Sequence, residues 1–351
     1  MKIHLLLLSF LFILNGCSVP GVKINKRVCN DATVYSLDNG LIKFNIWPEY
    51  NSVISDIELL KTQKKLTPKG YMPTVHHILL PPVRRWNPSG DSTVLWGLNS
   101  ARRTFILETK KTTPEGGALL RLRNSFFALR PITLYREIRL AGNEYRYTVN
   151  ISVVNNGKNS CNLSIWENVV PLYTKGDVVY MPEKKLNTLL VRNIQKHYLE
   201  EKLPPARNWI GCRRGQDIIV LRSGKVFPQA LYSWRSQKAD QDTMEMILPA
   251  EKLLPGGKIT GQFEMLFYPG LGGLNEVVGP VALRKSDNKL FFASAIALPS
   301  LTLKLDNGQI IRKNNMKPGE VTEVKLQKGT GDTLSGTLEG IGKFQLLKER
   351  N

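Results

Sequence analysis

The segment TVYSLDNGLIKFNIW, residues 33–47, decides the predicted fold. Apolar and polar residues alternate in residues 33–37 and again in residues 41–47, as they do in strands with one buried face. Asp38-Asn39-Gly40 stands between the two runs, and this combination is typical of a tight turn in which Gly40 takes a left-handed conformation. The segment therefore predicts a β-hairpin, and the same period continues in residues 53–60.

The two-residue period dominates the rest of the chain, and long helical periodicity is almost absent. Short turns of Asn, Gly and Pro separate the alternating runs. Further strands are predicted at residues 93–97, 105–110, 118–124, 132–140, 145–155, 161–171, 218–222, 230–234, 243–248 and 259–268. Many strands joined by short polar turns indicate an antiparallel sandwich or barrel.

A glycine-rich break at residues 269–273 predicts a boundary between two units. A short helix is expected near residues 274–283, and four further strands follow it, at residues 290–298, 301–305, 323–327 and 343–347. We therefore expect a large domain over residues 30–270 and a small C-terminal β-domain over residues 280–351.

Residues 1–16 resemble the signal peptide of a bacterial lipoprotein. Lys2 precedes an apolar run at residues 5–14, which is shorter than the roughly 20 residues that a membrane-spanning helix needs. Cys17 follows in a context similar to the lipobox, so we expect lipid on Cys17, and an ordinary signal peptide is the alternative. Because Ser18 follows it, the resemblance implies a lipid anchor at the cell envelope, in the outer membrane and facing the periplasm or the cell surface.

The chain is strongly basic, with 49 Lys and Arg residues against 29 Asp and Glu residues and a formal net charge of +20. Such a field attracts polyanions, which outside the cytoplasm are acidic polysaccharides, phosphorylated glycolipids and anionic lipid headgroups. The basic residues are scattered along the chain, so a generally basic surface without a dedicated site is the alternative. No nucleic-acid-binding motif accompanies the charge, and no nucleic-acid partner is expected.

Three cysteines follow Cys17, namely Cys29, Cys161 and Cys212. They form no Cys-x-x-Cys motif and have no histidine nearby in the sequence, so zinc is not expected. One disulfide with one remaining thiol, or three free thiols, fit the sequence equally well. The sequence also has no Gly-rich phosphate loop and no acidic calcium loop, so no metal or cofactor is expected.

Five segments of the chain, taken in order, match successive parts of a known domain. They are LDNGLIKF with VISDI at 37–57, LYREIRL with YTVNI and VNN at 134–156, LSIWEN at 163–168, MEMILP at 244–249, and LLPGG at 253–257. Together they resemble the galactose mutarotase-like β-supersandwich. This is the domain of aldose 1-epimerases, which also recurs in polysaccharide lyases and glycoside hydrolases. The resemblance implies an all-β protein with a large antiparallel β-supersandwich and a small C-terminal β-unit.

Aldose epimerases use a histidine acid and a glutamate base to move a proton between the ring oxygen and the anomeric hydroxyl of a sugar. The resemblance implies the base role for Glu245, and a buried ion pair is the alternative reading of this residue. No histidine stands where the Asn-His pair of these enzymes would lie, because the chain has Trp166-Glu167-Asn168 there.

Several side chains suit sugar binding, because aromatic rings stack on pyranoses while carboxylates, amides and guanidinium groups bond hydroxyls or uronates. Besides the catalytic candidate Glu245, we expect Arg84, Arg85, Trp86, Trp166 and Glu167 to contact the ligand. For the tryptophans, core packing is the alternative.

The predicted function is an envelope-anchored lipoprotein that binds carbohydrate, acidic glycans included, through a mutarotase-like domain without an assigned activity. The first alternative is a sugar epimerase or a component of a polysaccharide lyase or hydrolase. The second is a structural envelope lipoprotein without a sugar ligand.

Overall fold

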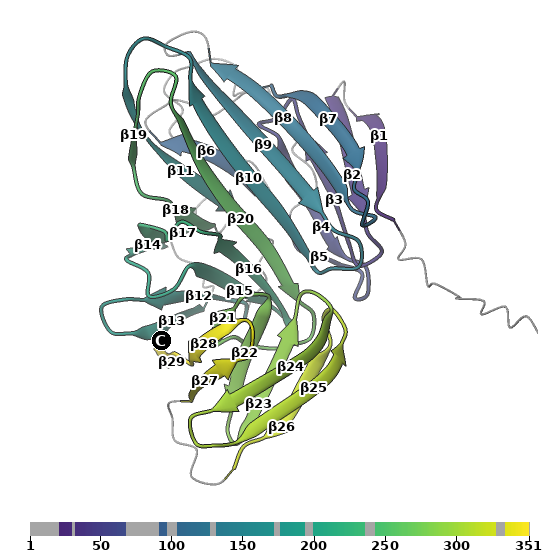
Figure 1. Ribbon diagram of the computed structural model, residues 1–351, viewed down its shortest axis with the longest axis vertical. Helices are drawn as coiled ribbons and strands as arrows, with labels where there is room; N and C mark the ends of the chain where they lie inside the picture. The colour runs from purple at the N-terminus through teal and green to yellow at the C-terminus, as the bar shows by residue number, and fades with distance from the viewer. Residues whose placement is uncertain are drawn as a thin grey trace, which may run out of the picture.

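The computed structural model describes residues 21–29, 32–67, 91–96, 104–126, 131–171, 176–193, 199–235, 243–327 and 334–350; for residues 91–96, 125–126, 199–200 and 235 it describes the backbone alone. Within these ranges the chain has no helix, and so no helical segment long and apolar enough to cross a membrane. The strands form two large sheets and two small ones (Figure 1). The predicted all-β fold class is confirmed.

Sheet A has eleven strands, and most of them come from the first half of the chain. Its order is β1 (Lys23–Cys29), β2 (Ala32–Asp38), β3 (Ile42–Trp47), β4 (Val53–Leu59), β6 (Asp91–Trp96), β11 (Cys161–Val169), β18 (Met244–Ile247), β17 (Ala230–Arg235) and β14 (Leu199–Leu203), with β5 (Lys64–Lys65) on β4 and β19 (Glu251–Leu253) on β11.

Sheet B has ten strands and packs against sheet A. Its order is β29 (Lys348–Arg350), β13 (Thr188–Asn193), β12 (Val178–Glu183), β15 (Trp209–Arg214), β16 (Asp217–Ser223), β20 (Lys258–Tyr268), β10 (Arg146–Asn155), β9 (Ile132–Leu140), β8 (Ala118–Phe126) and β7 (Ile106–Thr112). All described pairings are antiparallel except that of β13 with β29, which is parallel.

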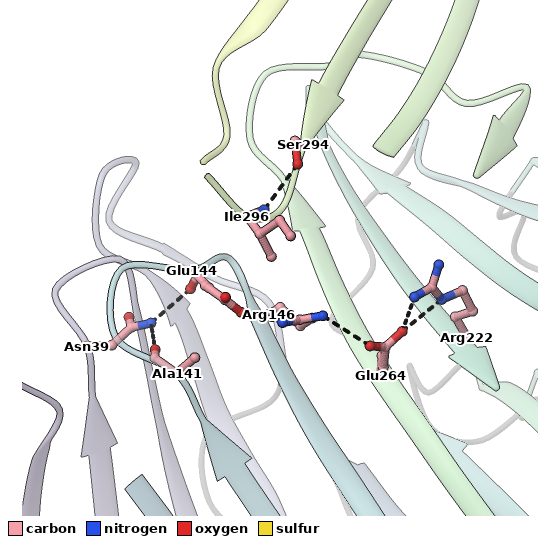
Figure 2. A network of polar contacts seen from close by, with 8 residues as sticks. All are labelled: Asn39, Ala141, Glu144, Arg146, Arg222, Glu264, Ser294 and Ile296. Atoms are coloured by element: carbon pink, nitrogen blue, oxygen red, sulfur yellow. Dashed lines mark hydrogen bonds and ion pairs between the residues drawn. The ribbon is translucent and has the colours of Figure 1, made fainter. Parts of the chain in front are cut away.

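The first hairpin forms as predicted and is tied to sheet B by its turn residue. Gly40 has a φ of 82°, and the Oδ1 atom of Asn39 accepts hydrogen bonds from the backbone N–H groups of Leu41 and Ile42, at 3.0 and 2.9 Å. The Nδ2 atom of Asn39 donates to the carbonyl oxygens of Ala141 and Glu144 in the β9–β10 turn (Figure 2). Because Asn39 is 4% exposed, these bonds satisfy a buried amide that joins the two sheets.

The core lies between the two sheets and is built by alternate residues of each strand. Phe44 of β3 meets Tyr147 of β10 with ring centroids 4.9 Å apart. Within this core lies a completely buried ion pair, in which Nη2 of Arg136 on β9 is 2.8 Å from Oε1 of Glu167 on β11. Nη1 of Arg136 also donates to the carbonyl oxygen of Ser52, in the left-handed turn before β4. Arg136 therefore joins sheet B to two elements of sheet A.

The C-terminal residues form two four-stranded sheets around a second apolar cluster. One sheet has the order β21 (Glu276–Val278), β22 (Val281–Ser286), β23 (Lys289–Ser294) and β26 (Val321–Lys325), and the other β25 (Ile310–Met316), β24 (Leu298–Leu305), β27 (Ser335–Leu338) and β28 (Gly342–Gln345).

The helix expected near residues 274–283 does not form. The apolar residues there make the hairpin β21–β22, which turns at Gly279 with a φ of 57° and at Pro280. Proline lacks the N–H that a helix interior needs, and a left-handed glycine ends helical geometry, so the pair separates two short strands. The strand β29 leaves this unit and returns to sheet B beside β13.

A buried carboxylate fastens the C-terminal unit to sheet B. Glu276 of β21 is 1% exposed; its Oε1 accepts from Nε1 of Trp209 at 2.9 Å, and its Oε2 accepts from Nε of Arg207 at 2.6 Å. Burial raises the pKa of the Glu276 carboxyl above its usual value, and the charge of Arg207 and the hydrogen bonds oppose that rise. The two partners therefore stabilise a carboxylate that would otherwise be costly to bury.

A chain of charged groups makes a second link between the same two parts. Arg146 contacts Glu144 at 2.9 Å and Glu264 at 3.3 Å, and Glu264 also accepts from Nε of Arg222 at 2.8 Å; Figure 2 shows Arg146, Glu264 and Arg222 in contact. Arg222 in turn donates to the carbonyl oxygen of Gly279 in the β21–β22 turn. Strands β10, β20 and β16 of sheet B are thereby connected to the C-terminal unit.

Candidate functional site

A row of polar side chains crosses three neighbouring strands of sheet A. Asn168 of β11 lies opposite Glu245 of β18, and Glu245 lies opposite Tyr232 of β17. Residues directly opposite one another in an antiparallel pair project from the same face of the sheet. Strand pairing thus brings together residues that are far apart in the sequence.

Trp166 belongs to the same face, because it lies two residues before Asn168 on β11. Its ring meets that of Tyr232 edge to face, with centroids 5.7 Å apart and an interplanar angle of 90°. Both rings are half-buried, whereas Asn168 is 2% exposed and Glu245 is 3% exposed. We call Trp166, Asn168, Tyr232 and Glu245 the site face: it combines two aromatic rings with a carboxylate and an amide.

The site face is turned away from sheet B. The intervening residues Met244, Met246 and Leu231 are fully buried in the core between the sheets. Ile54, whose side chain is also in that core, pairs with Asp91, and Asp91 pairs with the core residue Val169. The outward residues of β2, β3 and β4 therefore share the face of Asn168 and Glu245.

The expectation that Glu167 contacts a ligand is corrected by this geometry. Glu167 is the residue between Trp166 and Asn168, so its side chain projects from the opposite face, into the core. Its carboxylate is completely buried and paired with Arg136. Glu167 is a structural residue that joins the sheets beneath the site face.

A second polar group lies on the same outward face, over strands β2 to β4. The Oγ atom of Ser36 donates to Oδ1 of Asn45, and Nδ2 of Asn45 donates to Oδ2 of Asp56 at 2.8 Å. Ser55 donates to the same oxygen at 2.9 Å and accepts from Nε1 of Trp47 at 2.8 Å. Asp56 has a φ of 52°, which is costly for a residue with a side chain. The outward face of sheet A is thus polar and buried in two separate places.

Several residues of the predicted site lie outside the described part of the chain. These are Cys17, Arg84, Arg85 and Trp86, together with all four histidines of the sequence. Of the ligand-facing set, Trp166 and Glu245 come together on the site face. Sequence reasoning did not assign Asn168 or Tyr232 to the site; the alternation along β11 and the Tyr-x-Trp spacing of β17 were the signals that could have found them.

The described residues contain no group of three or more His, Cys, Asp or Glu side chains that could hold a metal ion. Cys29, Cys161 and Cys212 are free thiols, and the last two of them are buried.

The fold has counterparts among solved structures. A galactose mutarotase-like protein from Clostridium acetobutylicum aligns with a TM-score of 0.53 and 9% identity, over 70% of this chain and 98% of the other. A putative aldose 1-epimerase from Klebsiella pneumoniae aligns with a TM-score of 0.53 and 10% identity, over 69% of this chain and 82% of the other. A putative aldose 1-epimerase from Escherichia coli aligns with a TM-score of 0.51 and 11% identity, over 67% of this chain and 99% of the other.

The chain has a galactose mutarotase-like fold. No protein-family model matches its sequence, and no curated protein does. At 9 to 11% identity the likeness is one of architecture: the mutarotase-like fold supplies a scaffold, and the chemistry depends on the side chains that the scaffold carries.

Proposed function

We propose that the site face of this mutarotase-like domain binds carbohydrate. The observation that carries the proposal is the strand register that sets Asn168, Glu245 and Tyr232 side by side, with Trp166 edge to face against Tyr232. A pyranose has apolar C–H faces and a rim of hydroxyls, so it needs an aromatic surface beside hydrogen-bonding groups. A carboxylate and an amide supply those groups, and the carboxylate forms the stronger, charge-assisted bonds.

A catalytic variant of this function would use Glu245 as the base of an aldose 1-epimerase. The supporting observation is that Glu245 is almost fully buried on the outward face of sheet A, within the same row as a tyrosine. Proton transfer to and from a sugar needs such a group within hydrogen-bond reach of the anomeric hydroxyl. The partner acid would have to come from outside the described residues or from Tyr232.

Replacing Trp166 by Ala is expected to weaken sugar binding by about tenfold to a hundredfold, because aromatic anchors carry much of the energy of an interface. Glu245→Gln is the companion variant; it keeps the side-chain volume and removes the charge. Isothermal titration against neutral and uronic oligosaccharides measures the binding, and polarimetry of a dissolving α-sugar measures mutarotation.

Phe227→Ala is the matched control, since Phe227 is an aromatic residue that is 53% exposed and lies outside the site face. The thermal midpoint of each variant shows that it is folded. The binding proposal is wrong if no sugar in the panel gives saturable binding to the wild type. The epimerase proposal is wrong if Glu245→Gln leaves the mutarotation rate unchanged.

We further propose that the protein works as a lipoprotein of the cell envelope, anchored in the outer membrane through Cys17. The support is the signal-peptide pattern of residues 1–16 and the cysteine that follows it. Two or more acyl chains hold a protein stably at a bilayer, whereas one chain does so only marginally. A mature lipoprotein would therefore present the site face within a short distance of one membrane surface.

The anchor is tested by changing Cys17 to Ser in the full-length chain. The wild type is expected to incorporate labelled fatty acid and to sediment with membranes, whereas Cys17→Ser incorporates none, because serine lacks the thiol that carries the lipid. Separation of inner and outer membranes on a density gradient then locates the protein. A Cys17→Ser variant that still incorporates the label would exclude this site of lipidation.

A further inference from the structure

A groove crosses the outer face of sheet B, the face turned away from sheet A. Its volume is about 400 Å³, and it is lined by residues of β8, β9, β10 and β20 and of the β16–β17 connection. Glu137 and Tyr135 line it from β9, while Arg136 between them points into the core, so the groove and the site face lie on opposite sides of the molecule.

Strand register gives the groove a regular floor. One row runs from Arg121 through Glu137 and Asn150 to Gln262. The next row, one pleat further along, runs from Tyr135 through Ser152 to Thr260. The first row begins with two charged side chains and ends with two amides, and the second row carries only hydroxyl groups. The first row crosses three gaps between strands, which is a width of about 14 Å.

The β16–β17 connection forms one side of the groove and lies close to β20 at Gly224. The backbone N–H of Gly224 donates to the carbonyl oxygen of Gln262 at 2.8 Å, which holds the β16–β17 connection against β20. A Cβ atom at position 224 would lie 2.5 Å from Oε1 of Gln262. A larger residue at position 224 would therefore shift the side chain of Gln262, which lines the groove next to Lys225 and Val226.

Cations outnumber carboxylates around the groove. Lys225, Lys258 and Arg121 line it together with Glu137. The carboxylate of Glu137 is neutralised by Arg139 at 2.7 Å, and it also accepts from Nδ2 of Asn150 at 3.3 Å.

Arg121 and Arg123 share the carboxylate of Glu108, at 3.3 and 2.7 Å. Including these partners, five cations stand against two carboxylates, so the groove carries a positive field suited to an anionic ligand.

The positions of the cations indicate a ligand with several separated charges. Arg121 is on β8, three strands from β20, and Lys258 lies four residues along β20 from Gln262, which ends the row of Arg121. Their backbones are therefore about 19 Å apart. A chain with regularly repeated charges matches this spread of cations better than a single phosphate or carboxylate does.

The contact between Arg121 and Tyr135, the aromatic residue of the groove, favours a sugar acid over a nucleic acid as the ligand. The guanidinium of Arg121 lies 4.6 Å above the ring of Tyr135. This cation–π contact occupies a ring face that a nucleobase would need for stacking. Ser152, Thr260 and Gln262 lie between the cations, where hydroxyls of a polysaccharide would need partners.

We propose that this groove is a second binding site, and that its ligand is a linear acidic oligosaccharide with a carboxylate on each of several uronic acid units. The carboxylates pair with Arg121, Lys225 and Lys258, and the ring hydroxyls bond the amide and hydroxyl side chains between them. The proposal is independent of the proposed function of the site face, because the two lie on different sheets and share no residue.

The test is a titration of the full chain with a decamer of galacturonic acid in buffer containing physiological salt. The same decamer with its carboxyls reduced to alcohols is the neutral ligand, and an oligonucleotide of equal charge is the competing polyanion. Lys225→Gln combined with Lys258→Gln is expected to weaken binding of the acidic decamer about tenfold. Reduction of the carboxyls is expected to weaken it at least as much.

Lys184→Gln combined with Lys185→Gln is the matched control: it removes the same charge from two exposed lysines of the β12–β13 turn. Binding by this control within about twofold of the wild type supports the groove. An equal loss in the control would show a general charge effect and overturn the proposal, as would equal affinity for the reduced decamer or for the oligonucleotide.

A last measurement separates the two sites. Lys225→Gln combined with Lys258→Gln is expected to leave binding of neutral oligosaccharides by the site face unchanged, because both lysines line the groove on the other sheet. If Glu245→Gln abolishes binding of the acidic decamer and the groove variant does not change it, the groove proposal is wrong and the acidic ligand belongs to the site face.

Discussion

Replacing Arg136 by Met is expected to lower the free energy of unfolding by about 3 to 5 kcal/mol, because the change removes the positive charge that Arg136 places 2.8 Å from the buried carboxylate of Glu167. Both side chains of this pair are completely buried, so water cannot take the place of the guanidinium. The carbonyl oxygen of Ser52 loses its donor as well. Urea denaturation followed by circular dichroism measures the loss.

The double variant Arg136→Met, Glu167→Met tests the cause. Replacing a whole buried ion pair by apolar residues often leaves the free energy of unfolding nearly unchanged. The double variant is therefore expected to regain the stability that Arg136→Met loses, except for the roughly 1 to 3 kcal/mol that the Ser52 carbonyl oxygen costs when it has no donor. Lys289→Met is the exposed control: its pair with Glu323 is about half exposed on both sides, so the expected change is below about 1 kcal/mol. A double variant as unstable as Arg136→Met would refute the assignment.

Replacing Trp209 by Ala is expected to cost about 3 to 5 kcal/mol, since the indole is completely buried and its removal leaves a large cavity. The same change removes the donor to Glu276, whose carboxylate fastens the C-terminal unit. We therefore expect local loosening as well as lower global stability. Urea denaturation reports the global loss, and hydrogen exchange at the backbone N–H groups of β21 and β22 reports the local one.

Trp209→Phe separates the two contributions, because it keeps most of the apolar volume and lacks the N–H. The expected cost is about 1 to 3 kcal/mol, the penalty for an incompletely bonded buried carboxylate. Faster exchange in β21 should accompany it, because Glu276 belongs to that strand. If Trp209→Phe is as stable as the wild type, the hydrogen bond to Glu276 does not fasten the C-terminal unit.

The sequence predicted the class of fold well, because the two-residue period and the Asn-Gly turn are local signals. The turn at Gly40 follows from local conformational preference. The second role of Asn39, bonding the β9–β10 turn, depends on a contact between sheets that no local pattern encodes. The hairpin β21–β22 was predicted as a helix because its short apolar runs carry no clear period.

Local sequence does not determine which residues of a strand project toward the site and which project toward the core. Trp166, Glu167 and Asn168 all suit sugar binding, yet adjacent residues of a strand point to opposite faces, and the choice depends on which face meets sheet B. Arg136 was not recognised as a core residue, because it lies among Glu137 and Arg139 and reads as part of a charged surface ladder. Its burial follows from the Glu167 partner, which the packing of sheet B against sheet A brings within 2.8 Å.

The site face also has a consequence for how the protein folds. Its row of residues joins β11 to β17 and β18, which lie some way further along the chain, so the row closes only after a long intervening segment has lost its conformational freedom. Chains rich in such distant pairings fold slowly. During refolding from urea, hairpins such as β2–β3 should therefore form well before the Trp166–Tyr232 contact, and ligand affinity should return in the last kinetic phase.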